Sequence, residues 1–389
     1  MSLLYFYKYP AFEVFLIFLG VFLFIDILFA LILSRLPKNR WALKSHAVIA
    51  VLVYGSLVWA FFIKHWDRNP ETFASLFFLT NHLTLLYLSK IVFLVIAWMF
   101  FIFRKKIIVK IASVFATLSF LLLFCGLYFG RFYFIVKETE ILSGKNLGIP
   151  LKIACITDLH LGQYYGHEKQ FKRLIEKVNN QHPDLILLGG DIICCFAEEM
   201  KPFIPYLKQL KARYGVYAVH GNHDYGDYFW WKNISEKKWN HRLLEYYYSL
   251  AHIELLNNAH VRLKELPVVI AGLENCGHPP YGCFADWNKA LQGISVDDYT
   301  ILLVHDPWNW AQVVGRYPQI KLTLSGHTHA YQVGIDSGRL RWSPFFPKNP
   351  WCGLYVRKDQ FLYISHGVGS AVFSGRLGVW PEITLITIR

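Results

Sequence analysis

Five short fragments of the sequence carry side chains of the types that bind divalent metal ions in proteins. Each fragment directly follows a short apolar run that is typical of a buried β-strand. The fragments are Asp158-Leu159-His160, Gly189-Gly190-Asp191, Gly221-Asn222-His223-Asp224, His305 and Gly326-His327-Thr328-His329. Carboxylate, imidazole and amide groups without a thiolate suit Mn, Fe, Zn or Co. We therefore predict a metal centre at the strand ends, where ligands gather in open sheets.

The spacing within the fragments supports this interpretation. Alternate residues of an extended segment share a face, so Asp158 and His160 can point to the same side. His327 and His329 can do the same, or turn to reach two separate ions. A single His-x-His pair is more often structural, but five fragments that all follow strands favour a metal site.

The order of the fragments resembles the calcineurin-like metallophosphoesterase family, whose sequence blocks are D-x-H, G-D, G-N-H-D, H and G-H-x-H. The resemblance covers residues 150–389 and looks closest to the membrane-associated bacterial branch, which includes extracytoplasmic phosphodiesterases and some UDP-diacylglucosamine pyrophosphatases. The ending Pro381-Glu382-Ile383-Thr384 is also similar to that branch. The sequence departs from some relatives after the G-D block, where Ile192-Ile193-Cys194-Cys195 stand in place of a second carboxylate.

The resemblance implies roles for individual residues. It implies a first ion held by Asp158, His160 and His329, a second held by Asn222, His305 and His327, and Asp191 as the bridge between them. His223 would be the general acid or a clamp on the phosphate, and Asp224 would orient it. We expect two divalent ions, with manganese as the first choice and iron, zinc or cobalt as alternatives.

The elements that must position these residues alternate between strands and helices. Runs typical of strands are Ile153–Ile156, Leu185–Leu188, Val216–Val219, Val268–Ala271, Ile301–Val304, Leu322–Leu324, Phe361–Ile364 and Ile383–Ile388. Glu168–Asn180 and Lys201–Arg213 have the pattern of amphipathic helices. The pattern predicts a mixed α/β metallophosphoesterase domain, which is two packed β-sheets flanked by helices, over residues 150–389, with a linker and first strand at 131–149.

The region before it, residues 1–130, is predicted to be a bundle of about four transmembrane helices. The apolar runs are Ala11–Leu33, Ala47–Ile63, Leu83–Phe103 and Ile107–Gly130, each close to the ~20 residues that span a bilayer. Four such runs in one region argue against buried core helices. Asp26 inside the first run could be functional or could pair with a neighbouring helix, and Phe73–Asn81 could be an interfacial piece.

Charge sets the expected orientation and excludes one class of partner. Lys and Arg gather after the first run (Arg35, Lys38, Arg40 and Lys44) and after the third (Arg104, Lys105, Lys106 and Lys110). The positive-inside rule then places both loops in the cytoplasm and everything after Gly130 outside, which suggests a bacterial inner-membrane protein with an extracytoplasmic catalytic domain. The formal net charge of +13 forms no basic stripe, so we expect no nucleic-acid partner. Six of the seven cysteines follow Gly130, an even number that permits disulfides.

Two aromatic stretches bear on the substrate. One starts directly after Asp224 and includes Phe229, Trp230, Trp231 and Trp239 with interleaved lysines; the other includes Trp342, Phe345, Phe346 and Trp351 with Arg341 and Lys348. They are either packing clusters or a membrane-facing rim. We predict that Trp230 and Trp231 bind substrate, and that His366 is structural.

The sequence predicts a membrane-anchored, metal-dependent phosphoric ester hydrolase that cleaves a phosphodiester or phosphoanhydride bond in a lipid or membrane-proximal substrate. Two alternatives remain. One is a UDP-diacylglucosamine pyrophosphatase of lipid A synthesis, whose cytoplasmic substrate conflicts with the predicted orientation. The other is a non-catalytic metal-binding sensor, which the full ligand set disfavours.

Overall fold

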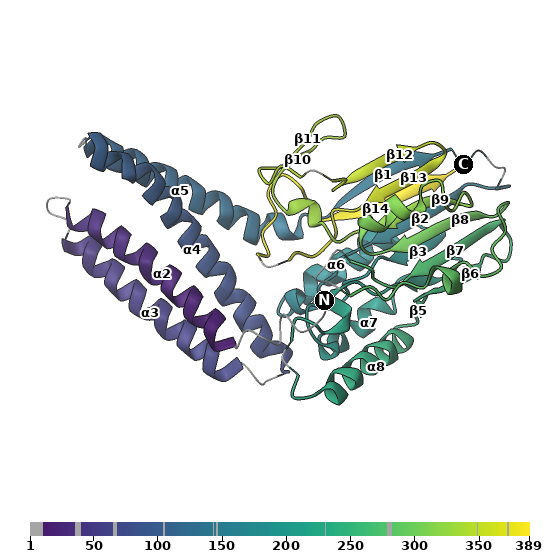
Figure 1. The fold of residues 1–389 in the computed structure, drawn as a ribbon, viewed down its shortest axis with the longest axis horizontal. Coiled ribbons are helices and arrows are strands. Elements are labelled where there is room, and N and C mark those ends of the chain that lie inside the picture. The colour runs from purple at the N-terminus through teal and green to yellow at the C-terminus, as the bar shows by residue number, and fades with distance from the viewer. Residues whose placement is uncertain are drawn as a thin grey trace. The chain divides into compact units, whose positions relative to one another are not determined.

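The structure is a computed structural model, and it describes residues 11–35, 40–64, 68–103, 106–142, 144, 147–229, 231–277, 282–347, 349–371 and 373–389. The predicted residues Lys38, Arg104, Lys105, Trp230 and Lys348 lie outside this part. The chain separates into two compact units, Leu3–Tyr128 and Phe129–Arg389. Figure 1 shows the first as a group of long helices and the second as layered strands with shorter helices.

The first unit confirms the four predicted apolar helices. They are α2 (Ala11–Ser34), α3 (Arg40–Lys64), α4 (Pro70–Phe103) and α5 (Lys106–Tyr128). Each contains a window long and apolar enough to cross a membrane, and the last such window extends from Ile107 to Phe132. Phe73–Asn81 continue the same hydrogen-bonded helix as the third span, and their interfacial position stays a prediction.

A buried ion pair joins three of these helices. Asp26 on α2 accepts hydrogen bonds from Lys90 Nζ on α4 at 2.5 Å, from Tyr54 Oη on α3 at 2.7 Å and from Tyr87 Oη on α4 at 2.9 Å. A charge placed among apolar helices is stable only when it is paired in this way. Asp26 therefore pairs with neighbouring helices, one of the two alternatives left open by the sequence.

The second unit contains the two predicted sheets. The order in the first sheet is β1 (Ile135–Ile141), β14 (Glu382–Ile388), β2 (Leu151–Ile156), β3 (Leu185–Leu188), β4 (Val216–Ala218) and β5 (Glu254–Leu255). The order in the second is β12 (Gly353–Arg357), β13 (Gln360–Ile364), β9 (Ile320–Ser325), β8 (Tyr299–Val304), β7 (Val268–Leu273) and β6 (Ala259–Arg262). A hairpin of β10 (Ile335–Asp336) and β11 (Arg341–Trp342) stands apart from both.

The alternation of side chains along the strands explains how the sheets are covered. Ile153 on β2 and Leu187 on β3 lie in one apolar cluster with Ile301 and Leu322 of the second sheet, so the two sheets pack face to face. Ala154 on β2, whose side chain points the other way, lies in a cluster with helical residues on the outer face.

The helices of this unit are short, apart from two. They are α6 (Glu168–Asn179), α7 (Ile204–Leu207), α8 (Ile234–Leu250), α9 (Trp287–Ala290) and α10 (Trp310–Val313). The helix predicted over Lys201–Arg213 was too long, because Ala197–Phe203 is a 3-10 helix (η3) and only Ile204–Leu207 is α-helical. Pro202 and Pro205 interrupt the backbone bonding that a longer helix needs.

Candidate metal centre

The five predicted fragments meet at one edge of the domain. β2, β3 and β4 are parallel neighbours in the first sheet, and β8 and β9 are parallel neighbours in the second. Parallel strands place their carboxyl ends on the same side, so the loops that follow them converge. Asp158, Asp191 and Asn222 come from loops of the first sheet, and His305 and His327 come from loops of the second.

Two groups of side chains in this region can each hold an ion. In the first, the ligand atoms of Asp158, His160 and His329 lie within 4.8 Å of one another. His160 Nε2 and His329 Nε2 are 3.2 Å apart, and His329 Nε2 is 3.5 Å from Asp158 Oδ1. Imidazole nitrogens and a carboxylate oxygen that face one point form a ready set of metal ligands.

The second group consists of Asp191, His305 and His327. His305 Nε2 is 3.1 Å from Asp191 Oδ2 and 3.2 Å from His327 Nδ1. The Nδ1 of His305 donates to the carbonyl of Gly189 at 2.8 Å, which leaves its Nε2 free to face the group. Asn222 Oδ1 is buried and accepts no hydrogen bond within the described structure, as expected of an oxygen whose partner is a metal ion.

Asp191 lies between the two groups. Its Oδ2 is 3.7 Å from His160 Nε2 on one side and 3.1 Å from His305 on the other. Burial alone raises the pKa of this carboxyl, but His305 and His223 outweigh burial and hold the pKa well below its ordinary value. Burial also lowers the pKa of His160 to about 3, so this imidazole is neutral and its lone pair can bind a cation.

The backbone at these residues is strained. Asp158, His160, Asp191, His327 and His329 all have positive φ angles, between 47° and 70°. Non-glycine residues seldom adopt this left-handed conformation, which persists only where the surrounding structure enforces it. Five of the seven predicted ligands thus share a costly conformation that aims their side chains inward.

His223 lies beside both groups and is partly buried. Its Nδ1 donates to the carbonyl of Cys194 at 2.7 Å, and its ring stacks on Tyr228 at 3.9 Å. The hydroxyl of Tyr228 accepts a hydrogen bond from Asn222 Nδ2 at 2.7 Å, which fixes the orientation of the Asn222 amide. The sequence had placed Tyr228 in an aromatic stretch without assigning this role, since no local pattern marks it.

The carboxylate of Asp224 binds the backbone of the loops around it. It is buried and accepts from the backbone N–H groups of Ile192, Ile193 and Gly221 at 2.8–3.2 Å, and burial raises its pKa to about 7. Asp224 therefore ties the Asp191 loop to the Asn222 loop. Its role in orienting His223 stays a prediction.

Glu199 supplies a carboxylate that the sequence analysis missed. It is fully buried and accepts from the backbone N–H groups of Gly162, Cys194, Cys195 and Phe196 at 2.7–3.0 Å. It therefore supports the loop where some relatives have an acidic residue. The sequence signal that could have identified Glu199 is its position in the first turn of a helix, where a glutamate often binds backbone N–H groups.

Arg376 is the second residue that was missed. It is completely buried, and its guanidinium donates to the carbonyls of His329 at 2.7 Å, His366 at 2.8 Å and Gly369 at 3.1 Å. These partners are backbone atoms of other loops, so no sequence pattern predicts them.

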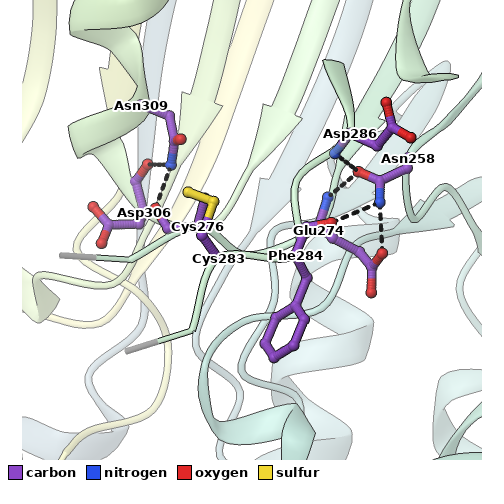
Figure 2. Close-up of a disulfide and its surroundings, with 8 residues drawn as sticks. All are labelled: Asn258, Glu274, Cys276, Cys283, Phe284, Asp286, Asp306 and Asn309. Carbon is purple, nitrogen blue, oxygen red and sulfur yellow. Dashed lines mark hydrogen bonds between the residues drawn. A yellow bond between two sulfur atoms is a disulfide. The ribbon is translucent and has the colours of Figure 1, made fainter. Parts of the chain in front are cut away.

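A disulfide lies close to the second group. Figure 2 shows Cys276 and Cys283 joined by a yellow bond, near Asn309 and Asp306. Asn309 Nδ2 donates to the Cys276 carbonyl at 2.9 Å, and Asp306 follows the predicted ligand His305. Phe284, next to Cys283, stacks on Tyr225 at 4.3 Å. The disulfide thus holds a loop beside the metal groups.

The first aromatic stretch packs against the protein. Phe229 contacts buried Phe196 at 5.3 Å, and Trp231 contacts Phe229 at 4.9 Å and donates its indole proton to Gly226 at 2.7 Å. Trp239 is exposed on α8. Substrate binding by Trp231 stays a prediction, as it does for Trp230, which lies outside the described residues.

Comparisons with known proteins agree with this geometry. Residues 151–331 match the calcineurin-like phosphoesterase family. The chain is 30% identical over 267 residues to a zebrafish transmembrane protein with metallophosphoesterase domain, covering 66% of this chain and 55% of that protein. It is 32% identical over 253 residues to the cow protein of the same name, covering 61% and 53%. It is 29% identical over 242 residues to an uncharacterised metallophosphoesterase of Bacillus subtilis, covering 61% and 79%.

These relatives come from animals and bacteria alike, so the similarity is broader than the bacterial branch that the motifs suggested. The chain spans about half the length of the two animal relatives. Residues 151–331 therefore resemble a calcineurin-like phosphoesterase domain, and the described residues include clusters of His and Asp that could bind metal. Four helices before this domain are long and apolar enough to cross a membrane.

Proposed function

We propose that this chain is a membrane-anchored two-metal phosphoesterase that hydrolyses a phosphodiester or phosphoanhydride bond in a lipid or another membrane-proximal substrate. The observation that carries the proposal is the convergence of two ligand groups on Asp191, together with the buried Oδ1 of Asn222 that has no hydrogen-bond partner in the described structure. Bound divalent ions, manganese first among them, would neutralise phosphoryl oxygens and lower the pKa of a water nucleophile.

The residues of the chain itself would do the rest. The seven proposed ligands are Asp158, His160, Asp191, Asn222, His305, His327 and His329. His223 is the candidate proton donor to the leaving oxygen: Cys194 engages its Nδ1 proton, and this orients its Nε2 for the transfer. Asp224 supports this step indirectly, because it holds the backbone that carries His223.

Two independent observations support an extracytoplasmic catalytic domain, and with it a bacterial inner-membrane location. The charge of the loops between the spans predicts it by the positive-inside rule. The disulfide between Cys276 and Cys283 suits an oxidising compartment, since cytosolic thiols are kept reduced. This orientation disfavours the pyrophosphatase alternative, whose nucleotide substrate is cytoplasmic. A reporter enzyme active only outside the cytoplasm, fused after Arg389, tests the orientation.

The metal content of purified protein tests the proposed chemistry. We expect two divalent ions per chain by elemental analysis, and hydrolysis of bis(4-nitrophenyl) phosphate that a chelator abolishes and added Mn²⁺ restores. Asp191→Asn should lower occupancy of both ions, because this carboxylate is proposed to bridge them. Asp359→Asn, at an exposed residue, is the matched control and should change neither quantity. Hydrolysis by protein that contains no metal would overturn the proposal.

A further inference from the structure

The β10–β11 hairpin and the loop after it display a group of large apolar side chains to solvent. The members of this hairpin surface are Tyr331, Ile335, Leu340, Trp342, Phe345 and Phe346, and each is between 40% and 74% exposed. In Figure 1 the hairpin projects from the edge of the strand layers. Exposed apolar groups this dense within one segment mark an interaction site rather than ordinary surface.

Ion pairs hold the base of the hairpin to the rest of the domain, so the position of its tip is fixed. The carboxylate of Asp336 is buried and is bound by Lys137 of β1, by His366 Nε2 at 2.9 Å and by Arg341 Nε at 3.5 Å. Asp336 is the only acidic residue between Tyr331 and Pro347, while Arg339 and Arg341 are basic. Because Arg341 pairs with the buried carboxylate of Asp336, the hairpin surface combines exposed aromatic and aliphatic groups with the positive charge of the exposed Arg339.

A chain of contacts connects this support to the end of the last membrane span. His366 binds Asp336 through Nε2, and its Nδ1 is 3.2 Å from the carbonyl of Trp380. The ring of Trp380 contacts the ring of Tyr133 at 5.5 Å, edge to face. Tyr133 is the residue directly after Phe132, where the last candidate span ends. The base of the hairpin is therefore linked by direct contacts to the residue that follows the last candidate span.

The hairpin surface is also continuous with the metal centre. Tyr331 is two residues after the proposed ligand His329, and its ring stacks on Phe345 at 5.8 Å. The hydroxyl of Thr328, between the two proposed histidine ligands, donates to the carbonyl of Trp351 at 2.6 Å. A molecule bound at the hairpin surface would thus lie beside the entrance to the metal groups.

From these contacts we infer that the hairpin surface docks into the interface of the lipid bilayer that holds the spans. Aromatic side chains and arginines favour this layer, where rings meet acyl chains and cations meet anionic headgroups. Docking would hold the metal centre against the membrane surface and present it with phosphate groups of lipids. The docking itself needs no catalysis. Only its consequence, the presentation of lipid phosphate groups to the metal centre, rests on the proposed function.

Photocrosslinking of the full-length protein tests the docking. The protein is placed in nanodiscs of phosphatidylcholine and phosphatidylglycerol that include a lipid with a diazirine in its acyl chain, and crosslinked peptides are mapped by mass spectrometry. We expect crosslinks in the four spans, which serve as the internal control, and also at residues 340–346. Crosslinks in the spans alone would overturn the inference.

Variants sharpen the result. Phe345→Ser combined with Phe346→Ser should lower crosslinking at residues 340–346 about tenfold. The loss of even one aromatic side chain weakens the partitioning of this segment from water into the bilayer by about that factor. Tyr246→Ser, at an equally exposed aromatic residue on α8, is the matched control and should leave it unchanged. Hydrolysis of bis(4-nitrophenyl) phosphate in the same nanodiscs separates the two proposals. Activity without hairpin crosslinks rejects only the docking, and crosslinks without activity reject only the catalytic function.

Discussion

Replacing Arg376 with Met is the perturbation whose effect follows most directly from the structure. The guanidinium donates to the carbonyls of His329, His366 and Gly369, and all three belong to loops around the first group of ligands. Met fills a similar volume but offers no donor. The substitution therefore removes the donor to the buried carbonyls of His366 and Gly369, whereas the His329 carbonyl still accepts from the backbone N–H of Gln332 at 2.9 Å.

The magnitude follows from the carbonyl oxygens of His366 and Gly369. A buried polar group left without a partner costs about 1–3 kcal/mol. Part of this cost is offset, because burial lowers the pKa of Arg376 to about 10, a sign that keeping the charge inside is itself unfavourable. We expect a net loss on the order of 3 kcal/mol in the free energy of unfolding. In a domain of this size, that loss lowers the melting temperature by roughly 6–12 °C.

Thermal unfolding of the full-length protein in detergent measures this effect, with Mn²⁺ affinity as a second readout. Affinity should fall, because His329 loses the contact that holds its backbone at a φ of 49°. Arg316→Met, at an exposed arginine that lies over the ring of Tyr317, is the matched control and should change neither value. If the Arg376→Met variant had the same melting temperature and Mn²⁺ affinity as the Arg316→Met control, Arg376 would not support the loops that carry the proposed ligands.

Two further predictions follow. His223→Ala should keep both ions and lower turnover about 10²–10⁴-fold on substrates with poor leaving groups, but much less on nitrophenyl esters; equal losses on all substrates would indicate that His223 clamps phosphate instead. At Asp336, burial raises the pKa, but hydrogen bonds from His366 and Lys137 outweigh it and lower the pKa below the ordinary value. The stability that Asp336 contributes should therefore be present above about pH 4 and be lost as the pH falls further. Measured by thermal unfolding as a function of pH, the stability of the Asp336→Asn variant should fall less steeply below about pH 4 than that of the wild-type protein.

The sequence was sufficient to predict the fold class and the convergence of the five fragments. Strand runs such as Leu185–Leu188 are apolar throughout, as expected for strands covered on both faces, and the strand found there has the same bounds. Because ligand fragments follow parallel strands, their meeting at one edge is a consequence of topology. The individual roles assigned to Asp158 and the other ligands stay predictions, since no ion is present to test them.

The sequence failed where a residue acts through the backbone of a distant loop. Glu199 and Arg376 bind mostly main-chain groups around the site, and such partners carry no residue identity that a pattern could show. The backbone N–H groups that bind the Asp224 carboxylate are equally absent from any sequence pattern. The orientation of His223 by Asp224, which the family resemblance implies, stays a prediction.

These missed residues explain how the strained ligand loops can exist at all. A left-handed non-glycine residue costs on the order of 1 kcal/mol, and five of them lie among the proposed ligands. Hydrogen bonds to charged groups contribute about 1.5–3 kcal/mol each, and Asp224, Glu199 and Arg376 all donate or accept them at the backbone of these loops. The strain and its compensation are therefore of the same order. The charged residues shape the backbone, and the side chains of the ligands remain free to bind ions.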